Sequence, residues 1–199
     1  GEPSGWSAVT LGYKGRLRVR LTAVRSSAHP AREDTTAAEA VVEAWRTLSD
    51  WTRDVNRDGA PGAFDRLQAS LVHVASSSDG VEDRAVADVA FRLPPAWPPE
   101  AVRAALATLD VGPLVRFDAD EGEVAVRGPR DGTLARAFRV AIRGQGGVPT
   151  SKVKTGTSDW NVLAPVWDVE ALAYGPGDAN LDHTPYERLA LEDLDRAVT

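Results

Sequence analysis

The side chains best suited to chemistry gather in the stretch from Lys154 to Arg188. Small and hydroxyl residues crowd together in Thr155-Gly156-Thr157-Ser158-Asp159, and the dyad Asp182-His183 follows further on. A carboxylate beside an imidazole can orient it or ligate a metal next to it, and glycine lets the backbone approach a ligand closely. A lone histidine in a loop is also commonly a solvated or capping residue, so both interpretations of His183 stay open at this point.

A short apolar run, Ala171–Tyr174, leads into the loop that carries His183. It ends at Gly175-Pro176-Gly177, where glycine and proline force the chain to turn. An apolar run bounded by turn residues is typical of a buried strand. Because ligands bind beyond the carboxyl ends of strands in open α/β sheets, we expect chemistry at this loop.

Two segments carry a resemblance to a known family: TGTSDWN from Thr155 and AYGPGDANLDHTPYE from Ala173. They resemble the C-terminal signature of the co-catalytic zinc aminoacylases and carboxypeptidases, which include acetylornithine deacetylase and succinyl-diaminopimelate desuccinylase. The nearest resemblance is to the branch that hydrolyses lysine or ornithine from an amino-group carrier protein in lysine and arginine biosynthesis. The chain has Ala179 where that branch usually has serine, and Tyr186 where it usually has asparagine. Neither difference removes a ligating group.

The opening Gly1-Glu2-Pro3-Ser4 is similar to a G-E-P-S/T motif that lies mid-chain in this family. The resemblance implies that the chain is a C-terminal fragment with the lid domain, and that Glu2 and His183 are metal ligands. The complete site would hold two zinc ions, with cobalt as a possible replacement, and would polarise an amide while generating hydroxide. The family's other ligands and its general base precede the G-E-P motif and have no counterpart here. We therefore expect the isolated chain to be a poor hydrolase.

The resemblance also implies roles in catalysis and substrate binding. His29 would donate a hydrogen bond to the scissile carbonyl or its oxyanion across a dimer, although a loop histidine before proline is often structural. Arg92, at the end of an expected strand, would hold a substrate carboxylate, and an arginine on a solvated edge is an equal alternative. The loop residues expected to line the substrate pocket are Gly156, Thr157 and Ser158. Asp159 is expected to cap a helical turn, and His73 to be a sheet residue.

The spacing of apolar residues predicts a strand–helix–strand–strand–helix–strand order between Gly15 and Val126. The expected elements are Gly15–Val24, Thr35–Trp51, Leu67–Ala75, Ala85–Leu93, a helix from Pro98 or Pro99 to Leu109, and a last pair, Leu114–Phe117 and Glu123–Val126, turning at Asp120-Glu121-Gly122. This order is the ferredoxin-like split βαβ arrangement. The expected fold class is α/β, with a ferredoxin-like α+β lid or dimerisation domain (9–126) inserted in an incomplete α/β zinc-peptidase-like catalytic portion (1–8 and 127–199).

Four further elements are expected after the insertion. They are a helix at Thr133–Arg143, a short strand at Pro149–Lys152, a helical turn at Asp159–Leu163 and a terminal helix at Glu187–Val198. In the terminal helix the apolar side chains of Leu189, Leu191, Leu194 and Val198 are expected to face inward, because they recur at helical spacing.

Composition and charge limit the kinds of partner that the chain is expected to bind. The 199 residues carry a net charge of −6, which does not favour nucleic acid, and no apolar run approaches the length of a membrane helix. The chain has no cysteine, hence no disulfide framework and no thiolate metal site, so we expect a cytoplasmic protein. One local exception is a basic stripe of Lys14, Arg16, Arg18 and Arg20. Such a stripe is usually a solvated face or an edge strand protected by charge, but it could also steer an acidic carrier protein toward the chain.

Three functions follow from these observations. The first is part of a zinc-dependent amide hydrolase that releases lysine or ornithine from an amino-group carrier protein, or from its N-acetyl form. The second is an N-acetylornithine-type deacylase or a metallo-carboxypeptidase acting on a small acyl-amino-acid. The third is a non-catalytic module that forms a homodimer through the lid domain. No nucleic acid or membrane partner is expected under any of them.

Overall fold

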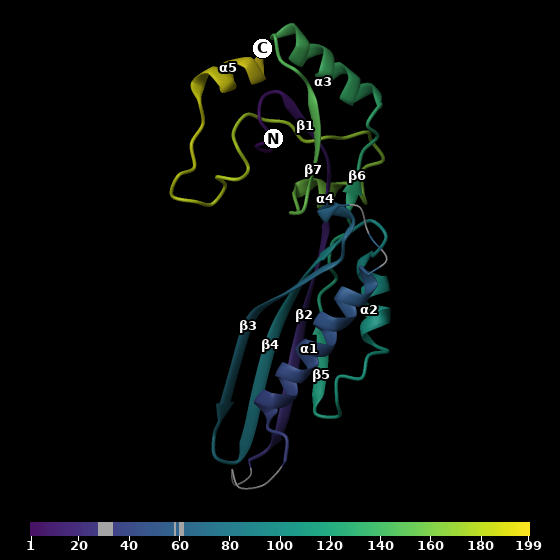
Figure 1. Ribbon diagram of the computed structural model, residues 1–199, viewed down its shortest axis with the longest axis vertical. Helices are drawn as coiled ribbons and strands as arrows, with labels where there is room; N and C mark the ends of the chain where they lie inside the picture. Colours follow the sequence, from purple (N-terminus) through teal and green to yellow (C-terminus); the bar gives the residue numbers. More distant parts are fainter. Residues whose placement is uncertain (28–33, 58, 60–61) are drawn as a thin grey trace. The chain divides into compact units, whose positions relative to one another are not determined.

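The computed structural model of the protein describes residues 1–27, 34–57, 59 and 62–199 (Figure 1). The chain forms two compact units. Residues 1–14 and 125–199 make up one, here called the terminal unit, and residues 15–124 make up the other, here called the inserted unit. The observed junctions differ from those expected after residues 8 and 126, because strand β1 (Ala8–Tyr13) pairs with two strands of the terminal unit.

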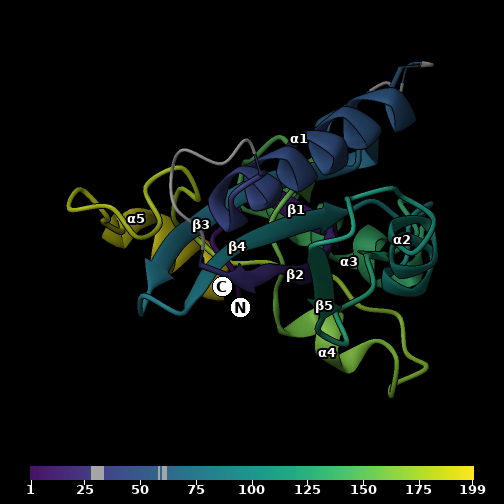
Figure 2. The same cartoon turned by 90° about the horizontal axis from the view of Figure 1, so that it is seen from below.

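The inserted unit is a four-stranded sheet with the order β3-β4-β2-β5, in which every pair of neighbours is antiparallel. Its elements are β2 (Gly15–Ser26), α1 (Ala37–Val55), the 3-10 turn η1 (Ala63–Asp65), β3 (Gln68–Ser78), β4 (Glu82–Leu93), α2 (Pro99–Leu106) and β5 (Val115–Ala119). Both helices lie on the same side of the sheet (Figures 1 and 2). The expected ferredoxin-like arrangement is confirmed.

Local sequence explains these elements. Strand β2 alternates between buried aliphatic residues, such as Leu17 and Val19, and more exposed arginines, so one face packs against the helices and the other meets solvent. Helix α1 starts at a capping box: the Glu39 N–H donates to Thr36 Oγ1 at 3.1 Å, and the Thr36 N–H donates to Glu39 Oε2 at 2.8 Å. Its apolar stripe, which includes Leu48, fills the core above the sheet.

The expected strand at Leu114–Phe117 is confirmed as β5, but its expected pairing with the segment Glu123–Val126 is wrong. Strand β5 pairs with β2, and beyond Asp120-Glu121-Gly122 the chain continues in the same direction along β2 as a single antiparallel bridge between Glu123 and Arg16, with N–H···O distances of 2.8 and 3.0 Å. The turn needs Gly122, whose φ is +70° and whose Cβ position lies 2.8 Å from the Arg16 carbonyl oxygen. Backbone groups of β2 therefore pair with both β5 and Glu123. Strand β6 (Val126–Arg127) instead pairs with β1, in the sheet of the terminal unit.

The terminal unit is built on a three-stranded sheet with the order β6-β1-β7, where β7 is Thr150–Lys154. Strand β1 is parallel to β7 and antiparallel to β6. Helix α3 (Thr133–Gly144) packs Ala135 and Ile142 against Val9 and Leu11 of β1. The unit also contains α4 (Asp159–Leu163) and α5 (Leu191–Val198). None of the described helices is long and apolar enough to cross a membrane.

Two predictions for the terminal unit need correction. The segment Ala171–Tyr174 forms only one antiparallel bridge, between Ala173 and Thr10, instead of a strand. Helix α5 starts at Leu191 instead of Glu187, and no residue of it is buried. The apolar residues expected to face inward include Leu189, Leu191 and Val198, whose exposed fractions are 45%, 76% and 75%. Amphipathic spacing predicted the apolar face, but no core in the described part of the chain covers it.

Candidate functional site

The Gly-Glu-Pro-Ser opening runs beside the Tyr-Gly-Pro-Gly turn, although the two motifs lie far apart in the sequence. The Glu2 N–H donates to the Tyr174 carbonyl at 3.2 Å, and the Ser4 N–H donates to the Gly175 carbonyl at 2.9 Å. A Cβ on Gly175 would lie 2.8 Å from the Glu2 carbonyl oxygen, so only glycine permits this approach. The fold therefore brings the candidate ligand Glu2 to the start of the loop that carries His183.

Two lysines of β7 hold the opening motif in place. Lys154 Nζ donates to the Pro3 carbonyl at 2.6 Å, and Lys152 Nζ donates to the Ser4 carbonyl at 2.8 Å. Lys154 Nζ also lies 3.9 Å from Glu2 Oε2. Because residues i and i+2 of a strand share one face, both ammonium groups reach the same segment. The sequence analysis did not predict this role. The only signal for it was the Lys-x-Lys spacing in a short strand.

Tyr13 is a second residue that sequence reasoning missed. Its side chain is buried, and its hydroxyl makes no hydrogen bond of standard geometry to the described residues. The pKa of Tyr13 is raised above its ordinary value, chiefly by burial and then by the negative charge of Glu2, with a smaller contribution from Asp182. The nearby Thr10 hydroxyl partly offsets this rise in the pKa of Tyr13.

His183 has the only positive φ among the described non-glycine residues, +61°. Its N–H donates to Glu187 Oε2 at 3.0 Å, which fixes this conformation, and its side chain is exposed. Residues held in the left-handed region are uncommon outside glycine and concentrate at functional sites. The backbone geometry of His183 thus adds an independent reason to consider it functional.

The loop between β7 and α4 is braced from within the terminal unit. The Ser158 N–H donates to Asn161 Oδ1 at 2.8 Å, and Asn161 Nδ2 donates to the Lys14 carbonyl at 3.0 Å. Ser158 Oγ is shielded from solvent and has no hydrogen-bond partner among the described residues. Gly156 has neither a positive φ nor any atom within 4 Å of its Cβ position. Ser158 is the N-cap residue of α4 and forms a capping box with Asn161, which accounts for a serine there, whereas the fold itself does not explain why glycine stands at 156.

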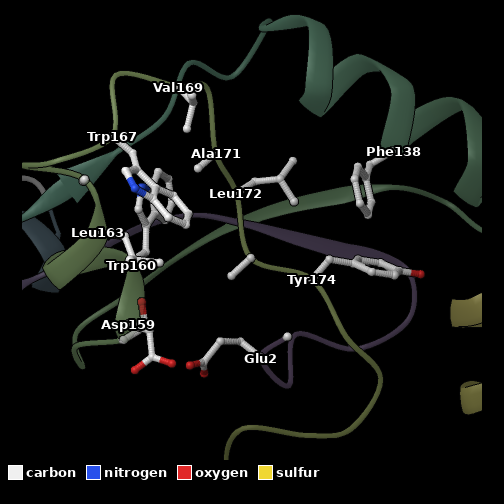
Figure 3. A pocket seen from close by; sticks show the side chains of 14 residues that line it. Glu2, Phe138, Asp159, Trp160, Leu163, Trp167, Val169, Ala171, Leu172 and Tyr174 are labelled. Carbon is white, nitrogen blue, oxygen red and sulfur yellow. The ribbon is translucent and has the colours of Figure 1, made fainter.

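A cavity of about 490 Å³ lies beside this loop (Figure 3). The carboxylates of Glu2 and Asp159 point toward each other at one end of it. The rest of the lining is mainly apolar: Phe138, Trp160, Leu163, Ala164, Trp167, Val169, Ala171, Leu172, Ala173 and Tyr174. Asp159 is the first residue of α4, where a carboxylate favours the helix dipole.

Four other residues singled out in the sequence have the following places in the structure. His29 lies outside the described residues. Arg92 belongs to the inserted unit, where it is exposed and stands opposite Arg16 of β2. His73 is exposed in β3, opposite Asp88 of β4. Thr157 is half-buried in the loop before α4.

The predicted basic stripe is not a row of free cations. Lys14 is fully buried. Arg16 forms an ion pair with Glu123 at 2.8 Å, and Arg20 forms one with Asp88 at 2.7 Å. Cross-strand neighbours supply these carboxylates, which alternation along β2 alone does not reveal. Two of the four predicted cations thus have carboxylate partners, while Arg18 is exposed.

The two candidate ligands, Glu2 and His183, supply part of what a zinc site needs. Carboxylate oxygen and imidazole nitrogen are ligands that zinc takes, and Glu2 and His183 supply one of each. Within the described ranges, however, no three side chains of the ligating types cluster as a metal site would require. The terminal unit therefore offers two donors, whereas a tetrahedral site needs four.

Comparison with known proteins shows which proteins this chain is similar to. The LysW-lysine hydrolase of Deinococcus radiodurans is 49% identical over 204 residues, which cover 100% of this chain and 55% of that protein. A protein of Pyrococcus furiosus, provisionally named a LysW-lysine/LysW-ornithine hydrolase, is 34% identical over 198 residues, or 100% of this chain and 54% of the relative. The chain is thus similar over its whole length to LysW-lysine/ornithine hydrolases. It spans about half the length of these curated relatives, and no family model matches it.

Solved structures agree on the fold of this LysW-lysine/ornithine hydrolase relative. An M20 family metallo-carboxypeptidase from Sulfolobus solfataricus superposes with a TM-score of 0.74 at 18% identity, covering 96% of this chain and 57% of that one. A tripeptidase from Staphylococcus aureus superposes with a TM-score of 0.72 at 12% identity, covering 98% and 52%. The family resemblance and the α/β fold class expected from the sequence are both confirmed.

Proposed function

We propose that this chain is part of a metal-dependent hydrolase that releases lysine or ornithine from the carrier protein LysW by cleaving a linear amide C–N bond. The observation that carries the proposal is the meeting of the Gly-Glu-Pro-Ser motif with the turn before Asp182-His183, in a chain 49% identical to a LysW-lysine hydrolase. Such a biosynthetic activity, in the lysine or arginine route, would take place in the cytoplasm.

Glu2 and His183 are proposed to hold zinc, with cobalt as an alternative that accepts the same donors. When bound, the metal supplies Lewis-acid polarisation of the amide and a hydroxide nucleophile. Lys154, 3.9 Å from the Glu2 carboxylate, balances its charge and holds the segment that bears it. With two donors in the described residues, the chain alone is expected to bind zinc weakly and to hydrolyse its substrate slowly.

Substrate contacts are proposed for three loop residues and for two residues of the inserted unit. The position of Ser158 in the lining of the cavity and the open space at Gly156 support the assignment of Gly156, Thr157 and Ser158 to the substrate pocket. Arg92 is proposed to bind a carboxylate of the substrate by a two-point guanidinium contact. His29 is proposed as the hydrogen-bond donor to the developing oxyanion, contributed across a dimer.

The proposed activity is testable in a chimera in which this chain replaces the matching 204 residues of the Deinococcus radiodurans relative. We expect the chimera to release lysine from LysW-lysine with kcat/KM within about tenfold of the relative, or about 1.4 kcal/mol. Release rates would be compared for LysW-lysine, LysW-ornithine, N-acetylornithine and a dipeptide ending in lysine. Faster cleavage of either small substrate would favour a deacylase or carboxypeptidase, and loss of all four activities would favour a non-catalytic module.

A homodimer formed through the edge strand β3 is part of the same proposal. Strand β3 pairs only with β4 inside the sheet, runs for 11 residues and exposes Leu71, Val72 and Val74 at 37%, 63% and 53%. A long apolar edge strand with unpaired backbone groups is a template for pairing with a second chain. A two-fold axis through β3 would cover this edge in both copies at once.

Lysines on the edge strand are expected to weaken the dimer. In the double variant Val72→Lys/Val74→Lys, two charges would enter the proposed interface from each subunit, and we expect the dimer dissociation constant to rise at least about tenfold. Sedimentation equilibrium measures this constant. Val81→Lys is the matched control, because Val81 is 78% exposed at the tip between β3 and β4 and off the edge. A wild-type monomer at high micromolar concentration, or equal dimers in all variants, would contradict the proposal.

A further inference from the structure

We propose that the terminal unit carries an interface for a further part of the polypeptide, on an apolar patch beside the cavity of Figure 3. The patch consists of Val162, Leu163, Val166, Trp167 and Val169. Its occupant is a segment that matches the part of the Deinococcus radiodurans relative which this chain does not cover. Coverage of the patch involves neither zinc nor substrate, so it can be tested apart from the hydrolase activity proposed above.

The patch gathers exposed apolar side chains in one short segment next to a hollow. Val166, Trp167 and Val169 are 76%, 59% and 65% exposed, and the other two members are exposed as well. Leu163, Trp167 and Val169 also line the cavity, whose remaining apolar walls come from α3, α4 and residues 171–174. Single exposed apolar residues are ordinary, whereas a group of them beside a hollow marks a place where another protein surface binds.

Hydrogen bonds fix the backbone at both ends of the patch. The N–H groups of Val166 and Trp167 donate to the Leu163 carbonyl at 3.0 and 2.9 Å, which closes a turn directly after α4. Beyond the patch, the Glu170 carboxylate accepts hydrogen bonds of 3.1 Å from two backbone N–H groups at the start of α3. An ordered segment therefore presents these side chains, and this order reduces the entropy that is lost when a partner surface binds.

The terminal unit buries little apolar surface of its own. Its buried apolar residues form two small clusters, one of Val9, Leu11, Ala135 and Ile142, the other of Tyr13, Val126 and Ala173. The inserted unit instead has one continuous core between its sheet and both of its helices. In addition, helix α5 of the terminal unit has no buried residue. Because domains are built from layers packed around one core, the apolar surface left exposed by the described residues calls for a further layer.

The lengths of the relatives indicate what this layer is. The match covers 55% of the Deinococcus radiodurans protein and 54% of the Pyrococcus furiosus protein, so nearly half of each relative lies outside it. A segment of the same polypeptide reaches the patch without the loss of translational freedom that accompanies the binding of a separate protein. A second copy of the chain already has its own contact surface in the proposed pairing through β3.

The test is the reactivity of a cysteine placed on the patch. The chain has no cysteine, so Val166→Cys and Val169→Cys each introduce a single thiol. Its labelling rate with a maleimide would be measured in the 199-residue chain and in the chimera, with the labelled peptide identified by mass spectrometry. We expect labelling to be at least about tenfold slower in the chimera, because a thiol in a packed interface reacts only when the interface opens. Val81→Cys, at the exposed tip between β3 and β4, is the control and should be labelled at equal rates in both proteins.

Each outcome of the labelling experiment has a distinct meaning. Equal rates at the patch in the chain and in the chimera would overturn the proposal. Protection in the 199-residue chain that grows with protein concentration would also overturn it, because a second copy would then cover the patch. If the chimera is inactive but its patch thiols are protected, the hydrolase proposal fails and the interface stands.

A second variant, Trp167→Asp, tests the interface between separate polypeptides and needs no folded chimera. The tagged chain would be co-expressed with the part of the Deinococcus radiodurans relative outside the matched 204 residues, and we expect the two to co-purify. A carboxylate in the patch should lower recovery of this partner at least about tenfold, because an unpaired charge is costly to bury. Val42→Asp, at an exposed position of α1 in the inserted unit, should leave recovery unchanged. No recovery with the wild-type chain, or equal recovery with all three chains, would overturn the proposal.

Discussion

Replacement of His183 by alanine in the chimeric hydrolase is expected to lower kcat/KM for LysW-lysine by about a thousandfold. A metal-bound amide and its hydroxide nucleophile derive several kcal/mol of transition-state stabilisation from the ion, and each 1.4 kcal/mol lost is tenfold in rate. The left-handed backbone of His183, held by Glu187, is the local feature that supports this role. Steady-state kinetics with saturating zinc, alongside metal analysis of the purified variant, would measure the effect.

His73→Ala is the control for this substitution. His73 is also an exposed histidine, but it lies in β3 of the inserted unit, opposite Asp88. Its replacement should change kcat/KM by less than about twofold, in line with the small effects of most surface substitutions. Retention of activity and of bound zinc in His183→Ala would remove His183 from the site, and the proposed metal chemistry would then need another imidazole.

Replacement of Phe91 by alanine is expected to destabilise the inserted unit by about 3–5 kcal/mol. Phe91 is fully buried in the central strand β4, opposite Leu17 of β2. Its ring meets the edge of Trp51 at a centroid distance of 6.4 Å, and Trp51 in turn meets Trp97 at 5.5 Å. Truncation would leave a cavity beneath an aromatic cluster that holds α1 and the segment before α2 on the sheet.

Urea unfolding followed by tryptophan fluorescence would measure this loss, because Trp51 and Trp97 belong to the affected cluster. Val42→Ala is the control: Val42 also lies in the inserted unit, on α1, but is 48% exposed, and its truncation should cost less than about 0.5 kcal/mol. A loss below about 1 kcal/mol for Phe91→Ala would mean that the sheet and helices do not share the tightly packed core described above.

Patterns in the sequence determined the elements that depend on neighbouring residues. Alternation located β2, because the two faces of a strand have opposite environments wherever the strand is placed. Helix α4 spans Asp159–Leu163 as expected, since short helical turns depend on a few adjacent side chains. The motifs around Glu2 and His183 were enough to indicate the family, because they preserve chemistry at fixed spacing.

Tertiary structure decided everything that depends on residues distant in the chain. The pairing of β1 with β6 and β7 moved the junction between the units, and cross-strand carboxylates neutralised arginines that looked free in the sequence. The register shift in β1 placed Tyr13 with Val126 and Ala173, away from the Val9–Leu11 core, and parallel pairing with β7 brought Lys154 to Glu2. Backbone hydrogen bonds and ion pairs between remote segments have no periodic trace in the sequence, so their partners become visible only when the chain is folded.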